Sequence, residues 1–210
     1  MVAEKSPDVA FIVLMAGTGL TGEQILYLQS DLISKAEGVS DDIIAKEHKL
    51  NEQLFAIIKQ EQDSVEAKKL MRDVFTNALA GMNDQDKQAL SLSPEMVDIS
   101  IRQMLSPWFR YFLTYDPAPT LTKVKCPVLA INGEKDLQVP PKENLPVIEA
   151  ALKAGGNSDF MVKELPGLNH LFQTTETGSP MEYSKIEETM SPDALDTIGN
   201  WIVEHTKGKK

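Results

Sequence analysis

The sequence predicts an α/β protein with a parallel sheet that a helical insertion interrupts. Residues 8–16, 127–132 and 160–165 are short apolar runs bounded by turn residues, which is typical of strands buried in a parallel sheet. Residues 23–115 follow helical spacing throughout. A helix over residues 141–154 separates the second run from the third, so strands and helices alternate as right-handed parallel crossovers require.

The helices are predicted from the residues that begin them. A serine followed by proline, or a threonine with glutamine three residues later, is a common start of a helix. Such starts occur at Thr21, Ser93, Ser106 and Ser191, and two more helices with apolar stripes begin near Ser40 and Ser64. The first run, residues 8–16, is continuously apolar, and we expect it to be buried on both faces and to need parallel neighbours. Residues 166–190 are predicted to be irregular.

Composition limits the possible partners. The 210 residues are 42% hydrophobic, enough for a core with one insertion, and carry a formal net charge of -10. Such a charge repels a phosphate backbone or an anionic lipid surface, so we expect neither nucleic acid nor membrane as a partner. The terminal basic run from Lys207 to Lys210 is interpreted as a solvated tail. The single Cys126 excludes an intrachain disulfide, and neither a signal peptide nor a membrane span is predicted, which leaves the localisation open.

Gly17, Gly19 and Gly22 have the G-x-G-x-x-G spacing of a dinucleotide-binding loop. That fingerprint also needs a second strand within ~30 residues, ending in an acidic residue that holds the ribose. Residues 23–61 are helical instead. We therefore expect an ordinary loop at the end of a strand, and no nucleotide or other cofactor.

Two polar residues follow consecutive predicted strands. Asp136 follows the second strand in N-G-E-K-D, and His170 follows the third in L-P-G-L-N-H. The carboxyl ends of adjacent parallel strands meet at one edge of a sheet, so the two loops should be neighbours. An aspartate there can accept the imidazole N–H, fix its tautomer and stabilise the imidazolium.

The order strand, G-E-x-D, V-P, helix, strand, P-G-x-x-H closely resembles the acid and base of α/β-hydrolases. Residues 132–141 and 164–173 carry most of the resemblance, and the segment from Thr177 to Trp201 looks like an esterase or peptidase-like branch of the superfamily. The resemblance implies that residues 1–22 and 116–210 are the C-terminal part of a hydrolase core, an incomplete sheet. It also implies that residues 23–115 are a helical cap over the site.

The family pattern also requires a nucleophilic serine in a G-x-S-x-G elbow before the acid, and the chain contains none. Residues 1–7 look like the tail of the helix that follows such an elbow, so we expect a fragment that is inactive alone. Cys126, at the start of a strand, is interpreted as a buried small residue. Three serines without the elbow context and two histidines without zinc-ligand spacing are not candidates for nucleophile or metal ligand: Ser6, Ser106, Ser179, His48 and His205.

By resemblance, the parent protein is a serine hydrolase of carboxylic esters, or of peptides or thioesters, with His170 as base and Asp136 as acid. Neither a metal nor a cofactor is implied. An aromatic group at the start of the last cap helix is a candidate lining for the substrate pocket, and packing of the cap against the core explains it equally well: Trp108, Phe109, Tyr111 and Phe112. The natural substrate cannot be read from the sequence.

A second hypothesis is a natural short protein, a non-catalytic binding module on a hydrolase-like scaffold. In either case the first strand lacks one neighbour in this sequence. A free strand edge favours pairing with another copy, so we expect a homo-oligomer.

Overall fold

The computed structural model describes residues 2–90 and 93–207, so most of the terminal basic run lies outside the described residues. The chain forms two compact units. Met1–Thr21 and Asp116–Lys210 make up the first, here named the sheet unit, and Gly22–Tyr115 make up the second, the helical unit. Among the described residues, no helix is both long and apolar enough to cross a membrane.

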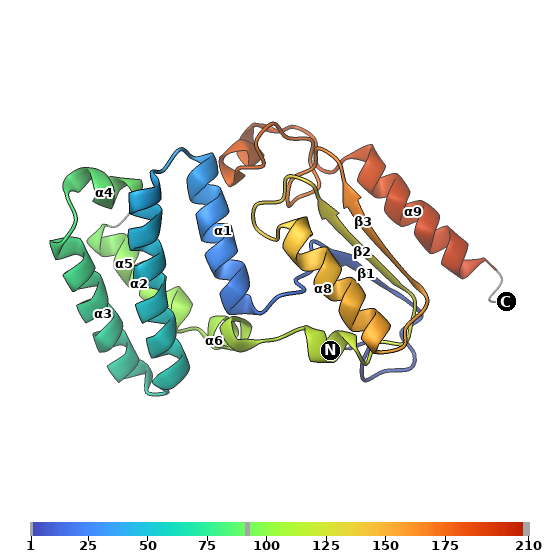
Figure 1. Cartoon of the computed structure of the whole chain (residues 1–210), viewed down its shortest axis with the longest axis horizontal. Coiled ribbons are helices and arrows are strands. Elements are labelled where there is room, and N and C mark those ends of the chain that lie inside the picture. Colours follow the sequence, from blue (N-terminus) through green and yellow to red (C-terminus); the bar gives the residue numbers. More distant parts are fainter. Residues whose placement is uncertain (1, 91–92, 208–210) are drawn as a thin grey trace. The chain divides into compact units, whose positions relative to one another are not determined.

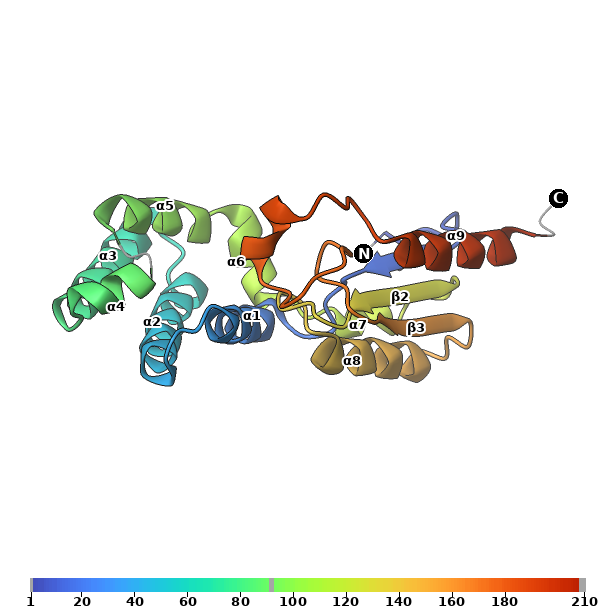
Figure 2. The ribbon, with the colours of Figure 1, turned by 90° about the horizontal axis from the view of Figure 1, so that it is seen from above.

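The sheet unit contains the predicted parallel sheet. Its strands lie in the order β1 (Ile12–Met15), β2 (Val128–Gly133) and β3 (Phe160–Leu165), with both pairs parallel. Helices α8 (Pro141–Ala154) and α9 (Pro192–Thr206) cover opposite faces of the sheet (Figure 2). The mixed α/β class and the three parallel strands are therefore confirmed.

Strand β2 is the centre of the core because all its residues are buried. Val128 and Ala130 point to one face, where they pack with Ile148 of α8. Leu129 and Ile131 point to the other face and pack in a cluster that includes α9. Full burial of each large aliphatic side chain contributes about 1.5–3 kcal/mol, so β2 fixes the sheet between its two helices.

The expectation that the first strand is buried on both faces is wrong for this structure. Every residue of β1 keeps part of its surface accessible, and Met15 is 41% exposed. The reason is that, within the described part of the chain, β2 is the only strand that pairs with β1. The outer edge of β1 carries no charged residue, whereas the opposite edge strand β3 carries Lys163 and Glu164.

The helical unit contains the predicted helices and a further short one. Helices α1, α2 and α3 lie side by side (Figure 1). The helices are α1 (Gly22–Ala36), α2 (Asp41–Gln60), α3 (Ser64–Ala80), the unpredicted α4 (Asp84–Ala89), α5 (Pro94–Met104) and α6 (Pro107–Thr114). Leu54, Met71, Ile101 and Leu113 form the fully buried centre of this unit.

Two more short helices of the sheet unit were not predicted, α7 (Ala118–Leu121) and the 3-10 helix η1 (Pro180–Lys185). The first described residues form a single turn, in which the amides of Lys5 and Ser6 both donate to the Val2 carbonyl at 2.9 Å.

Candidate functional site

Asp136 lies in the turn after β2 and is held there by backbone amides. Its Oδ1 accepts hydrogen bonds from the N–H groups of Gln138 at 2.9 Å and Val139 at 2.8 Å. The residue is only 1% exposed. A buried carboxylate needs such donors, and here they also fix its orientation.

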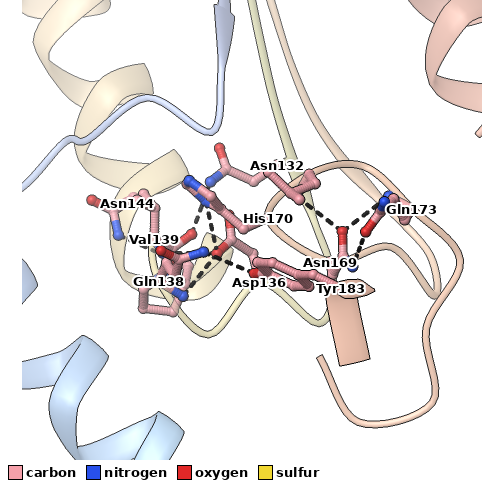
Figure 3. Close-up of polar contacts among 11 residues, drawn as sticks. Asn132, Asp136, Gln138, Val139, Asn144, Asn169, His170, Gln173 and Tyr183 are labelled. Carbon is pink, nitrogen blue, oxygen red and sulfur yellow. Dashed lines mark hydrogen bonds and ion pairs between the residues drawn. The ribbon is translucent and has the colours of Figure 1, made fainter. Parts of the chain in front are cut away.

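His170 comes from the loop after β3, and its ring faces the Asp136 carboxylate (Figure 3). The Nδ1 atom lies 3.0 Å from Oδ2 and 3.2 Å from Oδ1 of Asp136. With Nδ1–H donating to the carboxylate, the Nε2 atom carries the lone pair. The His170 side chain is 27% exposed while that of Asp136 is fully buried, so the imidazole is the accessible member of the pair.

The loops that carry Asp136 and His170 are joined directly to each other. The amides of Glu134 and Lys135 donate to the carbonyls of Leu165 at 2.8 Å and Leu168 at 2.9 Å. The Glu134 carboxylate accepts from the amide of Gly167 at 2.8 Å. These bonds hold the His170 loop against the Asp136 turn, which explains why two residues 34 positions apart meet with hydrogen-bonding geometry.

The turn that carries His170 has its own internal support. Asn169 is fully buried, and its Oδ1 accepts from the amides of Leu171 at 2.9 Å and Gln173 at 3.0 Å. Phe172 takes a left-handed backbone conformation, with φ of 59°, and its side chain is buried in the core. A strained residue held by its surroundings in this way is common at functional sites.

The loop after β1 reaches the same carboxyl edge of the sheet and is bound to α8. Asn144, fully buried, accepts from the amides of Gly19 at 2.8 Å and Leu20 at 3.3 Å, and donates to the Pro140 carbonyl at 2.9 Å. A side chain at Gly19 would place Cβ 2.4 Å from the Asn144 carbonyl oxygen. Close packing against α8 therefore explains this glycine without a nucleotide.

Within the helical unit, Gly22 is also explained by packing, since its Cβ would lie 1.9 Å from the carbonyl oxygen of Phe112.

The four aromatic residues proposed for a substrate pocket lie on α6 but do not share one face. Phe109 packs near Phe55 in the core of the helical unit. Trp108 is 67% exposed and stacks on Phe112 with ring centroids 5.1 Å apart, and Tyr111 is 51% exposed. Trp108 and Phe109 line an open cavity of 560 Å³, which falls in the range of small-molecule sites, about 300–1,000 Å³. A pocket role for these residues stays a prediction.

Two serines that the sequence excluded as nucleophiles have structural roles. The hydroxyls of Ser106 and Ser179 accept from the amides of Phe109 and Met181, both at 3.2 Å, and so cap helices. Cys126 packs against the core but is only partly buried, so the expectation of a buried residue is wrong. This partial burial raises the pKa of its thiol, which opposes formation of a thiolate. In the described part of the chain, the hydrogen bonds of the His170 ring go to Asp136 and to no serine hydroxyl.

The sequence interpretation missed three residues of the site. Asn144, Gln138 and Tyr183 bind the loops around Asp136, and Gln138 donates from its side-chain amide to the Tyr183 hydroxyl oxygen at 2.8 Å. Gln138 lies within the recognised motif, but its partner is 45 positions away. No local pattern of sequence marks such a contact.

The site is therefore a buried carboxylate and an accessible imidazole on neighbouring loops at the carboxyl edge of a parallel sheet. Comparisons of the chain with protein-family models, with curated proteins and with solved structures found no match.

Proposed function

We propose that Asp136 and His170 are the acid and the base of a serine hydrolase of the α/β-hydrolase type. Its substrate class is carboxylic esters, with peptides and thioesters as related acyl compounds. The attacking serine hydroxyl is supplied from outside residues 1–210. One observation carries the proposal, the contact of 3.0 Å between the His170 ring and a carboxylate that is itself oriented by two backbone amides.

The proposed chemistry follows from the orientation of the imidazole. As the serine oxygen bonds to the substrate carbonyl carbon, Nε2 of His170 takes the hydroxyl proton. The same nitrogen then returns that proton to the leaving alcohol or amine as the tetrahedral intermediate collapses. Asp136 keeps Nδ1 protonated and stabilises the imidazolium between these steps. Water then repeats the sequence on the acyl-enzyme and regenerates the serine.

The open edge of β1 fits the proposed source of the nucleophile. A strand that pairs in parallel with β1 would end at the same carboxyl edge as the loops of Asp136 and His170. A serine in the turn after that strand would lie near the imidazole. The uncharged edge of β1 is suited to such pairing, because edge strands that must stay unpaired usually carry charges.

The test is to read the source gene in frame upstream of the codon for Val2 and to express the whole product. We expect a G-x-S-x-G motif, and hydrolysis of p-nitrophenyl butyrate that falls by about 10⁴ in kcat when Asp136 is replaced by asparagine. His48→Ala, which changes a histidine of the helical unit, is the matched control and should leave kcat unchanged. An in-frame stop codon directly upstream, or hydrolysis indifferent to Asp136, contradicts the proposal and favours the binding module.

A further inference from the structure

Gln138 connects the Asp136 turn to the long segment after His170. Its backbone N–H donates to Asp136 Oδ1 at 2.9 Å, while its side-chain amide donates to the Tyr183 hydroxyl oxygen at 2.8 Å. Figure 3 shows Gln138, Asp136 and Tyr183 grouped beside the His170 ring. Any movement of Gln138 therefore moves one of the donors that orient the carboxylate.

Tyr183 is placed by a segment with many anchors. It lies on η1, where the Glu182 carboxylate accepts from the hydroxyl of Thr175 and, at 2.7 Å, from that of Thr177. These hydrogen bonds lower the pKa of Glu182, so the carboxylate that anchors the turn is ionised at neutral pH. The Lys135 ammonium also donates to the Thr175 carbonyl at 3.1 Å, which joins this segment to the Asp136 turn.

The phenol is suited to accept a hydrogen bond in this position. Burial is the main cause that raises the pKa of Tyr183; the hydrogen bond from Gln138 lowers it, and the nearby Asp136 charge makes a smaller contribution that raises it. The hydroxyl thus stays neutral, with its oxygen accepting from Gln138. A neutral partner holds Gln138 without placing a second negative charge beside the carboxylate.

We propose that Tyr183 is a positioning residue for the acid and base pair. By accepting a hydrogen bond from the Gln138 side-chain amide, its hydroxyl fixes the turn whose amides orient Asp136, and so maintains the hydrogen bond that His170 Nδ1–H donates to Asp136. The inference rests on the proposed function for its role in catalysis, but the hydrogen bond itself can be measured in this chain without a nucleophile or substrate.

The test is the Nδ1–H proton of His170, followed by NMR in the isotope-labelled chain. Its exchange with water reports how often the bond to Asp136 opens. We expect Tyr183→Phe, which removes only the hydroxyl, to speed this exchange about fivefold, as loss of one ordinary hydrogen bond does. Gln138→Leu should have a similar effect, and the double variant should add little, because both changes break the same contact.

Tyr27→Phe is the matched control, since it removes a tyrosine hydroxyl in the helical unit, where the ring stacks on His48. In this variant the Nδ1–H proton of His170 should exchange at the same rate as in the unchanged chain. A normal amide spectrum in the Tyr183 variant shows that the chain is folded. An unchanged exchange rate in both Tyr183→Phe and Gln138→Leu overturns the positioning role alone. Absence of a protected Nδ1–H in the unchanged chain instead contradicts the proposed function, and the positioning role with it.

Discussion

Replacement of Gly133 by alanine tests whether the two loops of the site are packed as the structure has them. Gly133 ends β2, and an added Cβ would lie 2.2 Å from the carbonyl oxygen of Leu168 and 2.5 Å from that of Asn169. Carbon contacts normally begin near ~3.5 Å, so the overlap is about 1.3 Å at the closer atom. Both obstacles are backbone atoms directly before His170, and no side-chain rotation can relieve the overlap.

We expect this overlap to cost about 3 kcal/mol of unfolding free energy, the upper part of the range for overpacking. For a chain of this size that corresponds to a fall of roughly 6–12 °C in the thermal midpoint. Gly199→Ala is the matched control, because no atom lies within 4 Å of its added Cβ in α9. Alanine there should raise stability by about 0.5–1 kcal/mol through helix propensity. Equal midpoints for Gly133→Ala and the unchanged chain would refute the contact between the two loops.

Three further substitutions test other parts of the sheet unit. Asn144→Ala leaves the Gly19 amide without its acceptor, so urea unfolding should show a loss of about 2 kcal/mol, and an unchanged midpoint would show that the loop does not depend on Asn144. The hydrogen bond to the Trp201 carbonyl is the main cause that raises the pKa of His205. The stability that His205 contributes is therefore complete below about pH 6.5 and is lost as pH rises through the pKa of the folded state. His205→Gln should remove this fall in the free energy of unfolding with rising pH, which urea unfolding at several pH values measures. If the free energy of unfolding falls with pH in the variant as it does in the unchanged chain, His205 is not the cause and the prediction is wrong. From the open β1 edge we expect light scattering at micromolar concentration to show a dimer or a larger oligomer. Met15→Lys should be a monomer, since a charge on the edge opposes strand pairing. A monomeric mass for the unchanged chain would contradict the prediction of an oligomer.

Much of the fold follows from local signals in the sequence. Serine and proline at the starts of α5, α6 and α9 predict those helices, because the serine hydroxyls cap amides that have no partner inside the helix. The short helix α4 was missed because its six residues are too few to show an apolar stripe, although Asn83 caps it. The burial of β1 was overestimated because an apolar run shows only that a strand is suited to burial. How much of the strand is buried depends on the strands and helices that pack against it.

The contact between Asp136 and His170 was predictable because both residues directly follow strands that the topology makes adjacent. The strand order alone is enough to predict that Asp136 and His170 lie close together. The contacts that support them could not be predicted from the strand order. Asn144 meets Gly19 across 125 positions, and Gln138 meets Tyr183 across an irregular segment, so both depend on the packed conformation of loops.

Labelling with a fluorophosphonate, which reacts with activated serine hydroxyls, tests the central claim most directly. The protein to be labelled is the whole product of the source gene, followed by mass spectrometry of its peptides. We expect one labelled serine outside residues 1–210, with labelling abolished by His170→Ala and retained in His48→Ala. Labelling that is absent, or that persists without His170, would contradict the assignment of this pair as the acid and base of a serine hydrolase.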